Sequence, residues 1–336
     1  MGPLVPSAFR AKPKMTKTTV STEPEQHMPP VTPSLGLISS RPLQGVLLLV
    51  GATLMFACND ATSKYLLNDY NVPLVQAVRY IVHTLLMLAI LAPKRGREIV
   101  QTNRTVLVIV RGLCLVVASF FFALALQRMP VAETVSIVYL SPILVVLLAR
   151  PLLGERIGWV GWMAAVIGFT GVLLIVRPGG GLDPIGVGFV LCNVVVTVAY
   201  YLLSRVLART ERTLALLFYT ALIGAICFGV TLPWTLHGKV PDLLQIVLFL
   251  SLGVTAGLGH YSITAAHRYA EASVLAPINY LHLLWAGLLG WAVFGHVPQL
   301  LTIVGMAVVL AAGVIVALRS IRGSNRCRTS RNRFGA

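Results

Sequence analysis

Two charged residues interrupt the apolar runs near the start of this sequence, and they are the first candidates for chemistry. Asp60 lies shortly before the end of one apolar run and Arg79 shortly after the start of the next. At about 1.5 Å per helical residue, both side chains would lie roughly 10 Å deep in a bilayer. A charge at the centre of a transmembrane helix costs about 2.5 to 3.5 kcal/mol, so each needs a partner or a function. We therefore expect an Asp60–Arg79 pair that either joins two helices or binds solute, with Asp60 as the proton acceptor.

Aromatic and polar side chains gather midway along two other apolar runs. Tyr139 and Ser141 lie in the first of these runs, shortly before Pro142. Proline supplies no amide donor, so the carbonyl of Val138 loses its helical partner. A carbonyl freed at membrane depth has to face another partner or a water-lined cavity. Tyr280 and His282 lie midway along the second run, so the two runs together predict a polar site near the membrane midplane.

Residues of these types could hold a polar, partly aromatic solute by stacking and hydrogen bonding, although tyrosine and tryptophan are also ordinary packing residues. Asn59 and Asn193 are added because each follows a cysteine in corresponding apolar runs. The candidate solute-binding residues are Asn59, Asp60, Arg79, Tyr139, Ser141, Asn193, Asn279, Tyr280, His282 and Trp285.

The remaining polar residues within apolar runs are expected to be structural. Glu133 and Glu271 each lie at the opening of a run, where we expect an acid at the headgroup level that is favoured by the helix dipole. Arg111 lies near the end of a run and could extend its guanidinium to the headgroups. Single histidines, here His83 and His260, more often join helices than bind ligands.

Composition decides the class of protein. Hydrophobic residues make up 57% of the 336 residues and charged residues only 11%. A soluble domain carries about a quarter charged residues, so a soluble globular enzyme is excluded. Four of the five cysteines lie in apolar runs, which predicts neither a disulfide framework nor a metal site. The sequence thus predicts a polytopic membrane protein that binds lipid, and no metal, cofactor or nucleic acid.

Ten apolar runs are long enough to cross a bilayer core of roughly 30 Å, which needs about 20 helical residues. Most of the gaps between them hold a proline, a glycine or a charge. They predict an all-α membrane protein with transmembrane helices at 43–66, 72–92, 105–126, 130–150, 157–176, 185–203, 213–235, 243–266, 270–294 and 299–318.

The net charge of +16 indicates orientation rather than nucleic-acid binding. Most basic residues fall in both tails and in alternate gaps, on the side that would be cytoplasmic if the N-terminus is inside. We therefore expect a multi-pass protein of the inner (plasma) membrane with both termini cytoplasmic. The Pro-rich residues 1–42 are expected to form a flexible tail, and 320–336 a basic tail.

The chain also shows an internal repeat. Ala125-Leu126-Gln127-Arg128 is followed by Tyr139, and Ala265-Ala266-His267-Arg268 is followed by Tyr280 at nearly the same spacing. Two halves of five helices result, 43–178 and 183–319. Because five is odd, the second half must enter the membrane inverted. Inverted repeats are typical of transporters with a site at the midplane between the halves.

Specific motifs resemble the EamA domain of the drug/metabolite transporter superfamily, over about residues 43 to 319. In the first half these are Met129-Pro130-Val131-Ala132-Glu133, Leu153-Gly154-Glu155-Arg156 and Arg177-Pro178-Gly179. In the second half they are Ala276-Pro277-Ile278-Asn279-Tyr280 and Phe294-Gly295-His296-Val297-Pro298. His296 departs from the family, whose members commonly carry an acid at this position.

The resemblance implies a secondary transporter of a small organic metabolite or drug, such as an amino-acid-like or heterocyclic solute. An importer of S-adenosylmethionine or riboflavin-like compounds is one alternative, and a channel or non-transporting scaffold is another. An intramembrane enzyme is not expected, because no catalytic residue set is recognisable. The ATP-binding motif Gly-x-x-x-x-Gly-Lys-Ser/Thr is also missing. A homodimer is left open.

Overall fold

The computed structural model describes residues 42–153, 159–176, 181–208, 210–236, 239–270, 275 and 278–315. Every secondary-structure element in these ranges is a helix, as the composition predicts. Five of the described helices are long and apolar enough to cross a membrane. These are α1 (Pro42–Leu66), α2 (Val72–Arg95), α3 (Thr105–Arg128), α7 (Pro184–Leu207) and α10 (Leu243–Tyr269).

Shorter apolar helices follow the other predicted segments. They are α4 (Val131–Val138), α5 (Leu140–Leu153), α6 (Trp159–Val176), α8 (Thr213–Gly229), α12 (Leu281–Phe294) and the helix Leu300–Ile315. Two single-turn elements, η1 (Gly96–Ile99) and α9 (Leu232–Thr235), lie between longer helices. The tails 1–41 and 316–336, with Glu271 and Pro277, lie outside the described residues.

The structure divides the predicted segment 130–150 at Tyr139, close to Pro142, where the sequence predicts an interrupted helix. The Tyr139 amide still bonds the carbonyl of Val135 at 3.3 Å. Pro142 has no amide proton to give to Val138, so the regular bonding ends there and α5 starts afresh. The expected helix over 213–235 is likewise divided into α8 and α9, and Pro233 lies in the first turn of α9.

Side-chain caps define where two of the long helices begin. Asp183 precedes α7 and accepts a hydrogen bond from the Ile185 amide at 2.9 Å, with proline in the first turn. Asp242 precedes α10 and forms a capping box with Gln245. Both caps use residue types that the sequence places just before an apolar run.

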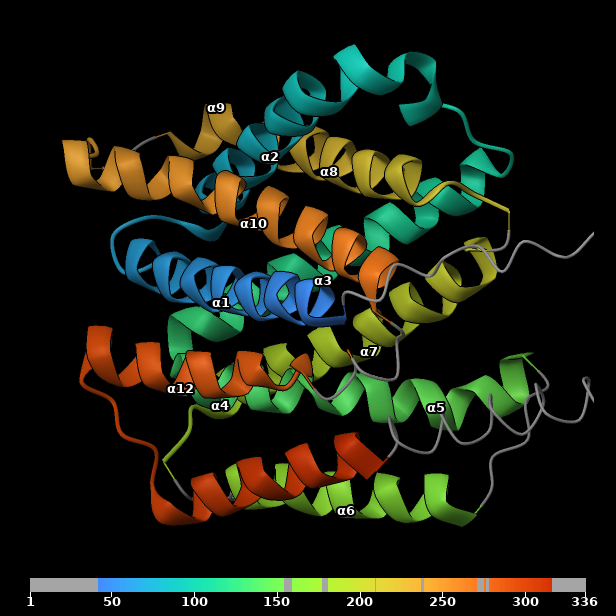
Figure 1. Ribbon diagram of the computed structural model, residues 1–336. Helices are drawn as coiled ribbons and strands as arrows, with labels where there is room; N and C mark the ends of the chain where they lie inside the picture. The colour runs from blue at the N-terminus through green and yellow to red at the C-terminus, as the bar shows by residue number, and fades with distance from the viewer. Residues whose placement is uncertain are drawn as a thin grey trace, which may run out of the picture. The chain divides into compact units, whose positions relative to one another are not determined.

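Helix contacts bring distant parts of the chain together. Figure 1 shows α1 between α10 and α12, and α3 beside α7, in agreement with the tertiary contacts. Glycines permit the closest approaches: a Cβ on Gly171 of α6 would lie 2.9 Å from the carbonyl oxygen of Gly305 in the helix Leu300–Ile315. Small residues at helix crossings are typical of membrane bundles, where backbone contact replaces the hydrophobic drive.

The outer surface of the helices is apolar. Trp159, Val106 and Leu300 are each about three-quarters exposed, at 77%, 74% and 76%. A soluble monomer rarely exposes apolar patches of this extent. The exposed apolar side chains therefore agree with helices that face lipid.

Candidate functional site

A carboxylate and an imidazole from opposite ends of the chain meet inside the helical bundle. The Nε2 atom of His282, in the first turn of α12, lies 3.0 Å from Oδ2 of Asp60 in α1. The two side chains are 17% and 12% exposed. Burying an ionised carboxylate is costly unless it is paired, and His282 is the partner that the structure provides.

The expected Asp60–Arg79 pair is wrong. The Arg79 guanidinium lies over the ring of Tyr80, 4.8 Å from its centroid. Asp60 pairs with His282 because α1 packs extensively on α10 and α12. Equal depth on consecutive helices was therefore not enough to bring Asp60 and Arg79 together.

Two tyrosines form one wall beside this pair. The rings of Tyr139 and Tyr280 lie 5.0 Å apart, and the Tyr139 ring is 6.1 Å from that of His282. The Tyr139 hydroxyl donates to the backbone carbonyl of Asn279 at 2.7 Å. The helix break at Tyr139 thus holds its side chain against the start of α12.

Phe56 of α1 continues the row of rings on the other side of His282. Its ring is 6.3 Å from His282 and 5.1 Å from His260 of α10. His260 in turn stacks on His83 of α2, with ring centroids 5.8 Å apart and planes inclined by 8°. No feature of the sequence marks Phe56 as a site residue, because a phenylalanine in an apolar run is ordinary.

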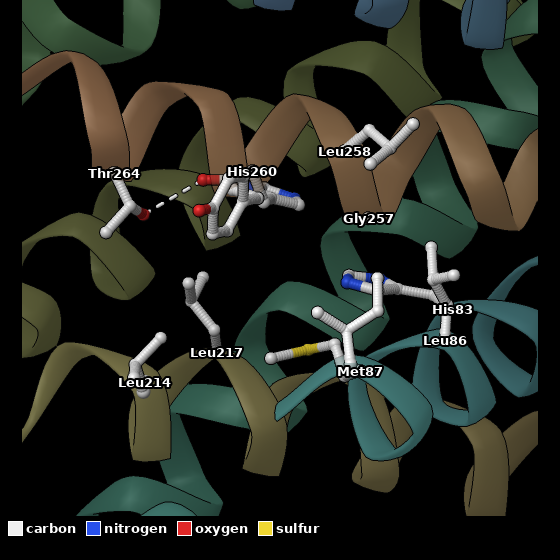
Figure 2. Close-up of a pocket in the computed structure, with 11 residues that line it drawn as sticks. His83, Leu86, Met87, Leu214, Leu217, Gly257, Leu258, His260 and Thr264 are labelled. Atoms are coloured by element: carbon white, nitrogen blue, oxygen red, sulfur yellow. Dashed lines mark hydrogen bonds between the residues drawn. The ribbon is translucent and has the colours of Figure 1, made fainter. Parts of the chain in front are cut away.

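The two stacked histidines border a cavity of about 210 Å³ between α2, α8 and α10. Figure 2 shows side chains of α8 facing those of α2 and α10 across this space. The wall is mostly apolar, and its lining residues include His83, Leu86, Met87, Leu214, Leu217 and His260. The cavity is therefore suited to an apolar or aromatic group rather than to a strongly hydrated one.

Glycines of α10 hold this arrangement in place. A Cβ on Gly259 would lie 3.0 Å from the Phe56 ring, and one on Gly257 would lie 3.2 Å from the His83 ring. Either contact is tighter than most real Cβ contacts, so a larger residue would displace the ring concerned. The glycines let α1 and α2 approach α10 closely enough to align the three rings.

Asn59 and Asn193 are placed as links between helices. Asn59 donates to the carbonyl of Leu252 at 2.7 Å and to Oγ1 of Thr255 at 2.9 Å, both in α10. Asn193 donates to the carbonyl of Ala118 in α3 at 2.8 Å. Both side chains are thus engaged in helix packing in this conformation.

Two other candidate residues have buried polar atoms without a hydrogen-bond partner. They are Oγ of Ser141 and Nε1 of Trp285. A buried donor or acceptor without a partner costs about 1 to 3 kcal/mol. These atoms are therefore places where a polar ligand could add a hydrogen bond.

Arg111 was expected to reach the headgroups, and this expectation is wrong because its side chain is 5% exposed. Nε donates to Oγ of Ser204 at 2.7 Å, and Nη2 donates to the Tyr200 hydroxyl at 2.7 Å. Nη1 donates to the Leu216 carbonyl at 3.1 Å and to Oγ1 of Thr220 at 2.9 Å. The guanidinium therefore joins α3 to α7 and α8.

Glu133 also differs from expectation. It lies in the first turn of α4, as predicted, but its side chain is 4% exposed rather than at the headgroups. Its Oε1 atom lies 2.9 Å from Nε2 of His296, which follows α12. The residue that departs from the family pattern is thus the partner of a buried acid.

Charged residues at the helix ends are paired across distant segments. The hydrogen bond from Lys239 lowers the pKa of Asp69 below its usual value. The hydrogen bond from Arg128, followed by that from the Ile185 amide, lowers the pKa of Asp183. Within the described ranges, no group of three or more His, Cys, Asp or Glu residues is arranged to hold a metal ion.

Comparisons with known proteins give consistent results. The chain is 30% identical over 292 residues to an uncharacterized transporter of Helicobacter pylori strain J99, covering 83% of this chain and 96% of that protein. It is 24% identical to an S-adenosylmethionine uptake transporter of Rickettsia bellii, covering 77% of this chain and 88% of that protein. It is 26% identical to a riboflavin transporter of Rhizobium johnstonii, covering 86% of this chain and 96% of that protein.

A solved crystal structure shares the fold, with a TM-score of 0.56 at 22% identity, covering 85% of this chain and 97% of that one. The model of the EamA-like transporter family matches this chain twice, over residues 43–177 and 184–318. These two matches confirm the resemblance seen in the sequence motifs. The chain belongs to the EamA-like transporter family.

Proposed function

We propose that this protein is a secondary transporter that moves a small organic solute across the inner (plasma) membrane by alternating access. The observation that carries the proposal is the partly buried Asp60–His282 pair, which lies beside Tyr139 and Phe56 where α1 meets α12. A titratable pair inside a membrane bundle marks a solute or proton pathway by default. Membership of a transporter family and the names of the relatives support this function.

The proposal includes ten spans in two inverted halves, 43–178 and 183–319. The helix contacts support it, because exchanging the halves converts one observed contact into another. In chain order, the exchange replaces α1 by α7, α2 by α8 and α3 by α10. The contact of α1 with α10 then becomes that of α7 with α3, and the contact of α2 with α10 becomes that of α8 with α3; all four are observed. Asn59 bonds an α10 carbonyl and Asn193 an α3 carbonyl, which follows the same exchange.

For the solute, we propose a molecule with a ring system and a polar or charged group. The named relatives carry S-adenosylmethionine or riboflavin, and each of these contains a heterocycle. The Asp60–His282 pair would bind the polar group, while the neighbouring aromatic rings and the apolar cavity in Figure 2 would contact the ring. Both termini would be cytoplasmic, as the distribution of basic residues indicates.

The test is solute counterflow in liposomes that contain the purified protein, with radiolabelled S-adenosylmethionine and riboflavin as separate probes. We expect one probe to be exchanged faster when unlabelled solute is present inside, because a carrier returns faster when loaded. Asp60→Asn should abolish the stimulation of uptake by a pH gradient. Tyr280→Ala and His282→Ala should lower counterflow at unchanged expression.

His267→Gln is the matched control, because the partner of this exposed histidine among the described residues is a carbonyl of its own helix. It should transport like the wild-type protein. Uptake without trans-stimulation would indicate a channel, and no uptake of either probe would favour a scaffold. Intact pH-driven uptake by Asp60→Asn would remove the proposed proton role of Asp60.

A further inference from the structure

A second cavity, of about 130 Å³, lies where the end of α3 and the start of α4 meet the start of α7 and the segment after α12. Unlike the apolar cavity of Figure 2, it is bordered by four ionisable side chains. These are Arg128, Glu133, Asp183 and His296. The solute site proposed around Asp60 does not include any of them.

Two of the four charges satisfy each other. Nη1 of Arg128 lies 2.8 Å from Oδ2 of Asp183, and the carboxylate also caps α7. Lys64 of α1 is the nearby cation on another packed helix, and its Nζ donates to the Leu126 carbonyl at 2.6 Å. α6, which also contacts α4, carries no ionisable residue. Neither Arg128 nor Lys64 is therefore placed to neutralise Glu133.

Glu133 is incompletely satisfied by His296, its partner among the described residues. Its Oε1 atom contacts the His296 imidazole, whereas Oε2 is buried and has no hydrogen-bond partner. A carboxylate can accept about four hydrogen bonds. Among the described lining residues, Arg128 and Asp183 offset each other, so an ionised Glu133 beside a neutral imidazole leaves one negative charge uncompensated. A cation with several N–H donors would supply both the charge and the missing hydrogen bonds.

The volume limits what could enter. One water occupies about 30 Å³ in the liquid, and pockets for drug-sized molecules measure about 300 to 1,000 Å³. A cavity of about 130 Å³ is therefore too small for a whole metabolite. It suits a primary ammonium group on a short aliphatic stem, with Gln299 and Thr302 completing the polar lining.

We infer that this cavity is a binding subsite for the primary ammonium group of the solute, with Glu133 as its counter-ion and His296 holding the carboxylate in place. The inference rests on the proposed function in one respect, that the ammonium group belongs to a transported solute. It also narrows the solute class, since S-adenosylmethionine carries a primary amine and riboflavin does not.

The test measures thermal unfolding of the purified full-length protein in detergent with methylammonium chloride as the probe. A bound probe stabilises the folded state by mass action, and we expect Tm to rise by about 2 °C or more near saturation. Tetramethylammonium chloride, whose cation has the same charge but no N–H donor, is one control, and sodium chloride is another. Neither salt should raise Tm in this way. Transport is not measured, so failure here is separate from failure of the proposed function.

Variants then assign the site. Glu133→Gln should lose the methylammonium effect, whereas Glu98→Gln should keep it, because Glu98 pairs with Arg212 outside the cavity. If Glu133→Gln does not fold, His296→Lys provides the second test. Its tethered ammonium should fill the subsite, so that added methylammonium no longer raises Tm.

Three results would overturn the inference. The first is an equal rise in Tm with tetramethylammonium or sodium, which would indicate a nonspecific salt effect. The second is a methylammonium effect that persists in Glu133→Gln or in His296→Lys. The third is a rise in Tm when the pH is lowered, without any effect of methylammonium. This result would indicate that the Glu133 carboxylate binds a proton rather than an ammonium group.

Discussion

At the scale of single residues, the site depends on small side chains as much as on charged ones. Tyr280 stands against Tyr139 because Gly313 leaves room for it: a Cβ on Gly313 would collide with the Tyr280 hydroxyl. Gly257 and Gly259 have the same function toward His83 and Phe56. The aromatic and ionisable residues of the site are thus positioned by glycines that have no side chain to contact a solute.

Gly313→Ala should therefore destabilise the protein and displace Tyr280 from Tyr139. Overpacking of a well-packed core costs about 1 to 3 kcal/mol, which we expect to see as a lower Tm in detergent. Tyr280→Phe removes the nearest colliding atom but keeps the colliding ring carbons Cζ and Cε1, so it should restore only a small part of the loss. Gly188→Ala is the matched control, since nothing lies within 4 Å of its added Cβ. Equal stability of Gly313→Ala and Gly188→Ala would contradict this packing argument.

At the scale of elements, polar links cross between helices at several depths. Arg111 joins α3 to α7 and α8 inside the bundle, and its described hydrogen-bond partners are neutral groups. Near the helix ends, Lys239 reaches Asp69 at 2.8 Å and thereby joins the start of α10 to the turn after α1. Buried links cost more to break than exposed ones, because nothing replaces the lost partners.

Arg111→Lys should lower stability by about 2 kcal/mol or more, because one ammonium cannot reach acceptors on two neighbouring helices. Arg111→Met should be less harmful than Arg111→Lys, since it also removes the buried charge. Unfolding by denaturant or heat in detergent would measure the order of stability of the wild-type protein and the two variants. Arg268→Lys, at the exposed end of α10, is the control and should be neutral. A lysine variant as stable as the wild-type protein would show that the four hydrogen bonds contribute little.

The Lys239–Asp69 bridge predicts a small pH-dependent effect. The Lys239 hydrogen bond lowers the pKa of Asp69, so this stabilisation is present above the usual carboxyl range and is lost as pH falls through the lowered pKa. The Asp69 hydrogen bond raises the pKa of Lys239, so the stabilisation is lost again as pH rises through that raised value. Lys239→Gln should therefore have a lower Tm than the wild-type protein near neutrality, with the gap closing at both extremes. A gap that widens in acid would contradict this assignment.

At the scale of the whole molecule, helix positions were more predictable than helix partners. Apolar runs that match the bilayer thickness indicated α1, α2, α3, α7 and α10, because this length constraint is local to each run. The interruption near Tyr139 was also predictable from local chemistry, because Pro142 cannot donate to the carbonyl of Val138.

Contacts between distant segments were not predictable in the same way. Asp60 pairs with His282 rather than Arg79, and Glu133 pairs with His296, because helix packing selects these neighbours. No short-range pattern in the sequence records that selection. The same limit explains why Arg111 was misplaced: its acceptors lie on α7 and α8, far along the chain.

The central claim is that one site between the two halves becomes accessible from each face of the membrane in turn. The most direct measurement places a single cysteine in α1 between Phe56 and Asp60, as Ala57→Cys, in a chain whose five native cysteines are replaced by serine. Membrane-impermeant maleimide is then applied to either face of oriented vesicles. The account predicts labelling from each face, with addition of saturating solute changing the two rates in opposite directions. Labelling from one face only, or from neither, would contradict it.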